Sequence, residues 1–217
     1  MAGRNVLGGL MIAVWACAAS TPGSQGLVTP RVQDVDLRKL PPSPVWAPGG
    51  PVREVPDLKR TDIPGQPAVT LGARTLRVVD RSVIVLATDG SRIAGPLAFG
   101  SLWPPAAEPC GVDVEWPPTI SVDREADRWL IWRSFQPVAG GAIPFCIAVS
   151  RTSDPVAGGW WLYDFSLPPN KYDPQQLDIS KEAYRLGGKT AERAIQIAFD
   201  RQAMLSGKPS SFSVATR

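Results

Sequence analysis

Acidic residues and cysteines are the groups in this chain that could do chemistry, because its 217 residues include no histidine. Without imidazole the chain cannot build a Ser–His triad, a histidine general base or a histidine metal site. Glycoside hydrolysis remains open, since it needs two carboxylates that face one pocket from separate strands. The sequence does not place any two of the six candidates together: Asp80, Asp113, Glu115, Asp123, Asp164 and Asp173.

Three acidic residues, Asp123, Glu125 and Asp127, fall within one predicted turn. Alternating carboxylates offer the oxygen ligands that Ca²⁺ prefers, but this turn lacks the glycine and the later glutamate of a known calcium loop. The alternative is a structural turn with solvated charges, neutralised locally by Arg124 and Arg128. We favour the structural turn and expect no metal and no other cofactor.

Asp154 stands in a second turn, Ser153-Asp154-Pro155, and Gly158-Gly159-Trp160 follows it. The arrangement is similar to the Asp-box of sialidase-type propellers, where the Asp accepts hydrogen bonds from its own turn and the Trp packs beneath. We therefore expect Asp154 and Trp160 to hold a hairpin, with metal or substrate binding by Asp154 as the alternative.

Tryptophans are concentrated in one part of the chain. Rings at this density either form a stacking platform for carbohydrate or pack in a core, and core packing is the commoner use. The five concerned are Trp116, Trp129, Trp132, Trp160 and Trp161.

Residues 1–19 predict a signal peptide: Arg4 is followed by an apolar run of 14 residues from Val6 to Ala19, and Ala16-Cys17-Ala18 resembles a cleavage site. The run is shorter than the roughly 20 residues of a membrane span. Cys17 leaves a lipoprotein open as the alternative, although bulky Trp15 fits that pattern poorly. We expect a secreted, periplasmic or cell-envelope protein that meets the membrane only through this segment or a lipid anchor.

Export bears on Cys110 and Cys146, which remain once Cys17 is removed or lipidated. An even count in an oxidising compartment predicts a disulfide, and two free buried thiols are the alternative. The loop between the two cysteines has 35 residues. In the chain-entropy model, closing a loop of that length stabilises the fold by about 3–4 kcal/mol.

Residues 20–74 predict an extended, largely disordered linker, because closely spaced prolines interrupt every apolar period. The linker is either a tether that lifts a domain from the membrane or a segment without a role. From residue 75 short β-branched and aromatic runs alternate with turns, which predicts an antiparallel all-β domain over residues 75–217. Sandwich, barrel and propeller all fit this pattern.

Local signals place several elements within this domain. Asp89-Gly90 predicts a hairpin turn, and Pro96 is expected to end the strand that follows it. Residues 178–186 predict a weak hairpin and 194–199 a strand. Residues 200–205 predict a short helix closed by Gly207. The polar, Ser-rich last ten residues predict no further strand.

Taken in order, the motifs from Leu76 to Phe212 resemble a largely uncharacterised family of exported bacterial proteins with a β-propeller-like domain. The resemblance rests on Asp89-Gly90, Trp103, Pro109-Cys110, residues 123–129 (DREADRW), 146–150 (CIAVS), Ser153-Asp154-Pro155, 160–165 and 199–205 (FDRQAML). It implies a partial array of antiparallel propeller blades, because the domain has room for about three blades and closed rings need at least four. The chain is expected to be truncated relative to that family, with an open sheet edge that favours oligomers.

The sequence thus favours an exported or cell-surface binding or structural protein without a catalytic constellation. Its partner would be a glycan or a protein at the cell surface. Nucleic acid is not expected, because the net charge of +3 is small and the basic residues are scattered. The alternative is a glycoside-hydrolase-like enzyme of the sialidase-propeller type that uses paired carboxylates.

Overall fold

A computed structural model describes residues 27–34, 36–40, 68–79, 81–104, 107–112, 117–135, 141–169, 171–189 and 193–216, with only the backbone for 171–176 and 189. The predictions on the signal peptide and Cys17 lie outside the described residues. So do those on Asp80, Asp113, Glu115, Trp116 and the side chain of Asp173.

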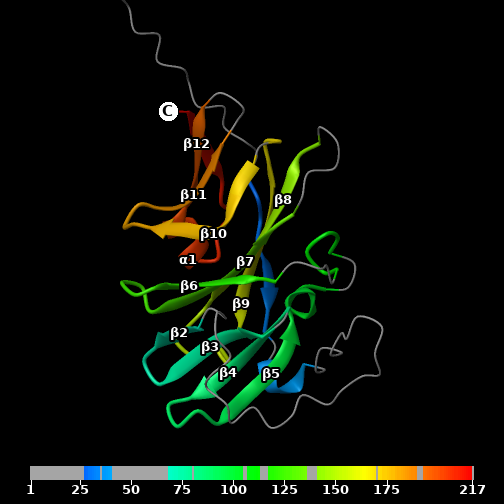
Figure 1. The fold of residues 1–217 in the computed structure, drawn as a ribbon, viewed down its shortest axis with the longest axis vertical. Coiled ribbons are helices and arrows are strands. Elements are labelled where there is room, and N and C mark those ends of the chain that lie inside the picture. The colour runs from blue at the N-terminus through cyan, green and yellow to red at the C-terminus, as the bar shows by residue number, and fades with distance from the viewer. Residues whose placement is uncertain are drawn as a thin grey trace, which may run out of the picture.

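Strands make up most of the described chain, and the helices among the described residues are short (Figure 1). The helices are η1 (Leu37–Lys39), η2 (Phe99–Leu102) and α1 (Arg201–Leu205). The strands are β1 (Arg31–Gln33), β2 (Ala68–Leu71), β3 (Arg74–Val79), β4 (Ser82–Ala87), β5 (Arg92–Ala98), β6 (Thr119–Asp123), β7 (Arg128–Ser134), β8 (Ile143–Ser150), β9 (Trp160–Leu167), β10 (Lys171–Ile179), β11 (Ala183–Lys189), β12 (Ala194–Asp200) and β13 (Phe212–Thr216).

These strands form three antiparallel sheets, each built from four strands that follow one another along the chain. We call them the first sheet (β2–β5), the middle sheet (β6–β9, with β1 added beside β9) and the last sheet (β10–β13). None of the three closes on itself among the described residues. The all-β prediction is therefore confirmed at the level of fold class.

The middle sheet packs between the other two, so both of its faces are buried. In β7, Trp129 and Ile131 join a core shared with the first sheet, whereas Leu130 and Trp132 join a core shared with the last sheet. A strand covered on both faces carries a continuous apolar run instead of an alternating one. This explains the sequence Trp-Leu-Ile-Trp at the centre of the chain.

The opening strands of the three sheets lie next to one another: β2 is against β6, and β6 is against β10. In Figure 1 the label of β6 stands between β10 above and β2 below. Each sheet then extends away from this line through its second, third and fourth strands.

The N-terminal segment differs from the linker expected for it. We call residues 27–40 the strap, because it runs along the outer side of all three sheets. Val28 bridges to Ser210 beside the last sheet, β1 pairs with β9, and Leu37 is buried against β5. A three-residue strand and one buried leucine leave no periodic apolar pattern in the sequence. The prolines around them therefore led to the prediction of a disordered linker. The first sheet likewise begins at Ala68, ahead of the expected boundary at residue 75.

Two predictions at strand ends are wrong. The strand expected to stop at Pro96 continues to Ala98, because β5 is an edge strand where a residue without an N–H is tolerated. The polar C-terminus forms β13, in which Phe212 packs into the core while Ser213 faces outward. The hairpin at residues 178–186 and the helix before Gly207 are confirmed.

Candidate functional site

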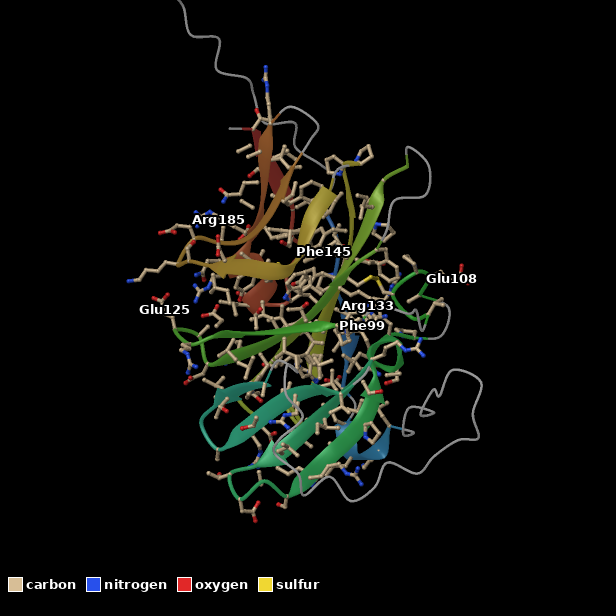
Figure 2. The ribbon with its side chains drawn as sticks, in the orientation of Figure 1. Phe99, Glu108, Glu125, Arg133, Phe145 and Arg185 are labelled. Atoms are coloured by element: carbon tan, nitrogen blue, oxygen red, sulfur yellow. A yellow bond between two sulfur atoms is a disulfide. The ribbon has the colours of Figure 1, made fainter. Side chains whose placement is uncertain are left out.

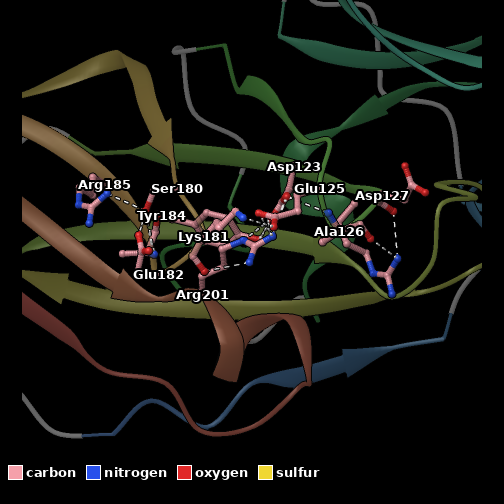
Figure 3. Close-up of polar contacts among 12 residues, drawn as sticks. Asp123, Glu125, Ala126, Asp127, Ser180, Lys181, Glu182, Tyr184, Arg185 and Arg201 are labelled. Atoms are coloured by element: carbon pink, nitrogen blue, oxygen red, sulfur yellow. Dashed lines mark hydrogen bonds and ion pairs between the residues drawn. The ribbon is translucent and has the colours of Figure 1, made fainter.

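The most polar buried group lies where the middle sheet meets the last sheet (Figure 3). Asp123 ends β6, and Arg201 begins α1. The guanidinium binds the carboxylate through two atoms, with Nε 2.6 Å from Oδ2 and Nη2 3.0 Å from Oδ1. The side chain of Asp123 is 0% exposed and that of Arg201 is 4% exposed. Such a two-point pair is the strongest geometry available to these side chains.

Tyr184 of β11 completes this group, since its hydroxyl donates to Oδ2 of Asp123 at 2.9 Å. The N–H of Ala126 donates to Oδ1 at 3.1 Å. We call Asp123, Tyr184 and Arg201 the inter-sheet latch, because Asp123 belongs to the middle sheet, Tyr184 to the last sheet and Arg201 to α1, which follows β12 of the last sheet. The carboxylate accepts four hydrogen bonds and has no need of solvent.

The charge states of the latch follow from these contacts. Burial alone raises the pKa of Asp123, but hydrogen bonds from Arg201, Ala126 and Tyr184 outweigh it and hold that pKa below its ordinary value. Burial, and then the neighbouring Asp123, raise the pKa of Tyr184. The hydrogen bond to Asp123 raises the pKa of Arg201. The latch is therefore a carboxylate, a neutral phenol and a guanidinium at neutral pH, and no member is poised to exchange a proton.

Asp123 thus differs from the solvated turn residue expected from the sequence. Its neighbour Glu125 does lie at the surface, 3.6 Å from Nη2 of Arg201 and 3.7 Å from Nζ of Lys181. Asp127 is exposed and adopts φ 53°, a turn conformation that Asp tolerates well. Within the described ranges no three acidic, cysteine or histidine side chains are grouped to hold a metal ion.

The far end of α1 is also tied to the middle sheet. Tyr163 of β9 directs its hydroxyl at the carbonyls that end the helix, with Lys208 O at 3.0 Å and Met204 O at 3.3 Å. Burial raises the pKa of this phenol, so it stays protonated and donates. At the helix start, Oδ1 of Asp200 accepts the N–H of Ala203 at 3.0 Å as an N-cap. Both ends of α1 are fixed in place.

Asp154 organises the turn that joins β8 to β9. Its Oδ1 accepts the N–H of Val156 at 2.9 Å, which is the Asx-turn geometry expected for it. The indole N–H of the buried Trp160 donates to Pro155 O at 3.1 Å. A side chain at Gly158 would collide with Thr152, because a Cβ there would lie 1.9 Å from Oγ1.

Ser150, which sequence reasoning did not single out, links this turn to β7. Its Oγ accepts the backbone N–H of Trp129 at 2.9 Å and its hydroxyl donates to Thr152 O at 2.7 Å. Its only signal in the sequence is a hydroxyl at the end of an otherwise apolar strand.

The predicted disulfide is confirmed. Cys110 and Cys146 are bridged, with their Cα atoms 5.7 Å apart, and both are buried. The bridge ties the connection between the first and middle sheets to β8.

Beside the disulfide lies a buried cation that the sequence did not indicate. Arg133 is the direct cross-strand neighbour of Cys146, and its guanidinium stacks 4.6 Å from the ring centre of Phe99 (Figure 2). The ring of Trp103 packs on Phe99 at 4.6 Å. These side chains fill the junction between the first and middle sheets.

The carboxylates needed by a glycosidase are not brought together among the described side chains. Asp123 lies in β6 and Asp164 in β9, at opposite sides of four adjacent strands. Three strand spacings separate β6 from β9 by about 14 Å, and the pairing also offsets the two residues along the strands. The two carboxylates therefore lie beyond the roughly 5–10 Å that either mechanism uses. Asp164 also pairs with Arg31 at 3.1 Å.

The described tryptophans of the cluster do not form a stacking platform. Trp129, Trp132 and Trp160 are each 0% exposed. Trp161 is partly exposed, but the guanidinium of Arg151 lies 4.8 Å from its ring centre. A Cβ on Gly207 would lie 2.5 Å from the same ring, so the glycine packs directly against it.

In comparisons with known proteins, no family model, no curated protein and no solved structure matches this chain. Over the residues that the structure describes, we find no helix long and apolar enough to cross a membrane.

Proposed function

We propose that this chain is an exported or cell-envelope protein with a binding or structural role and no catalytic site of its own. The buried disulfide between Cys110 and Cys146 carries the proposal, because such bonds persist in oxidising compartments and are rare in the cytosol. The signal-peptide pattern of residues 1–19 supports the same location. Whether Cys17 is removed or lipidated decides between a secreted and an anchored form.

The roles of the chemically distinctive residues support a non-catalytic function. Asp123 and Arg201 neutralise each other in a dry junction, and Asp154 is engaged by its own turn. In an active site one of these groups would face a pocket with a shifted pKa suited to proton transfer. Here they join strands and sheets instead.

We further propose that the three sheets are consecutive blades of a propeller-like domain. Each sheet is a meander of four sequential strands, as a blade is, and their first strands β2, β6 and β10 lie side by side. In a propeller the first strands line the central axis and binding partners meet the loops around it. A glycan or protein bound at the cell surface is the partner that suits this arrangement.

Cell fractionation tests the location. The full chain is expressed in a bacterial host beside a variant that lacks residues 1–19, and free thiols are alkylated at lysis. We expect the full chain in the envelope or the medium with Cys110 and Cys146 protected, and the shortened variant in the cytosol. Full-length protein in the cytosol with both thiols alkylated would contradict the proposal.

A further inference from the structure

The strap is held by few contacts for a segment that touches three sheets. Its strand β1 has only three residues, and the side chains of Leu27 and Val32 are 72% and 50% exposed. Leu37 is its one fully buried side chain among the described positions. Two backbone hydrogen bonds join Val28 to Ser210.

Two ion pairs fix the alignment of the strap, one with β9 and one with the turn between β8 and β9. Arg31 pairs with Asp164 at 3.1 Å, and Asp34 pairs with Arg151. All four side chains are between 30% and 73% exposed, and ion pairs this exposed to solvent add little to stability. The two ion pairs therefore determine which alignment the strap adopts, but they contribute little to the free energy that holds it in place.

The surface under the strap is built from other parts of the chain. The backbone of Trp161 pairs with Val32, and its ring is fixed between Arg151 and Gly207. Asp164 on β9 and Arg151 in the turn between β8 and β9 thus present opposite charges to the strap. They pair with Arg31 and with Asp34, which follows Arg31 three positions later in the strap. If the strap detached, β9 would be the edge strand of the middle sheet and could pair with another strand.

We propose that two copies of this chain exchange straps. The strap of one copy detaches locally from β9, and the strap of a second copy pairs with β9 in its place. Segments with few buried contacts open well below the free energy of global unfolding, and a free edge strand is a template for another strand. The strap is the segment whose register and charges fit this edge. The 27 residues from 41 to 67 span at most about 90 Å, enough to reach a neighbouring copy, and exchange preserves every contact.

Mixed cysteine variants test the exchange in the full chain. One preparation carries Asp34→Cys, a second carries Arg151→Cys with a larger tag, and the two are mixed under mild oxidation. We expect a disulfide-linked heterodimer whose yield rises with protein concentration. The control replaces Arg151→Cys by Thr88→Cys, an exposed position in the β4–β5 turn. A heterodimer yield no higher than that control at every concentration would overturn the proposal.

Two further measurements keep the result unambiguous. A chain with both Asp34→Cys and Arg151→Cys should close an internal bridge, which confirms that the variants fold with the strap in place. A synthetic peptide of residues 27–40 should suppress the heterodimer several-fold more than a peptide carrying Arg31→Glu and Asp34→Lys. Equal suppression by the two would refute the charge-set register, and suppression by neither would refute the acceptor site.

Hydrogen exchange on the unaltered chain gives an independent answer. Amides of β1 should exchange far faster than those of the central strand β8. If they exchange as slowly as β8, the strap opens only with the whole fold and no exchange of straps takes place.

Discussion

Replacing Arg201 by methionine is expected to lower the free energy of unfolding by about 3–5 kcal/mol. The substitution keeps the bulk of the side chain but leaves the carboxylate of Asp123, which is 0% exposed, without a countercharge. Removing one partner of a buried pair typically costs this much, a large share of the roughly 5–15 kcal/mol that stabilises a domain. Urea unfolding followed by tryptophan fluorescence measures the loss.

Two matched variants separate the latch from general damage. The triple variant Asp123→Leu, Tyr184→Phe and Arg201→Met removes every charged or hydroxyl group of the latch and should recover most of the loss, since apolar replacement of a buried ion pair is often neutral. Lys181→Met removes an exposed cation of the same junction and should change stability by less than about 0.5 kcal/mol.

The pH dependence of Arg201→Met follows from the pKa of Asp123. In the unaltered protein that pKa lies below its ordinary value, so the contribution to stability is present above about pH 4 and lost as pH falls through the folded pKa. Without Arg201, burial raises the folded pKa above the unfolded one, so the variant loses stability as pH rises. The gap between the two proteins should therefore narrow from pH 7 to pH 4.5. A gap below 1 kcal/mol, or one independent of pH, would refute the role of the latch.

Three more predictions concern the turns and the core. Replacing Cys110 and Cys146 by serine should cost about 3–4 kcal/mol in unfolding measurements; unchanged stability would contradict the role of the bridge. Asp154→Ala should lower stability by about 1–2 kcal/mol through loss of a capping hydrogen bond, and full thermal stability with loss of ligand binding would instead assign it to binding. Trp160→Phe leaves Pro155 O without its indole donor, whereas the Trp103 N–H has no partner among the described residues. In unfolding measurements Trp160→Phe should therefore cost about 1–3 kcal/mol more than Trp103→Phe. Equal costs of the two substitutions would contradict the role of the Trp160 hydrogen bond.

The fold class was accessible from sequence because strand signals are local. Runs such as Trp129–Trp132 and turns such as Asp89-Gly90 depend on neighbours a few residues away. The disulfide followed from the count of cysteines and the expected compartment. The strap was missed because its order comes from one buried leucine and from backbone pairing with β9, neither of which leaves a periodic pattern.

The latch could not be predicted for a related reason. Asp123 and Arg201 are 78 positions apart in the chain, and in the sequence each stands directly beside a residue of opposite charge, Arg124 and Asp200. Arg124 and Arg128 suggested local neutralisation of Asp123, but Nη1 of Arg128 donates to carbonyls of its own turn instead. The two motifs that contain Asp123 and Arg201 become one site only when the middle and last sheets pack together.

An intact-mass measurement of the envelope or secreted fraction, without reduction, is the decisive test of export and of the disulfide. We expect a chain that has lost its N-terminal segment or carries a lipid on Cys17, with a mass two hydrogens lower for the bridge between Cys110 and Cys146. Full-length protein with both thiols free would contradict export and, with it, the proposed function.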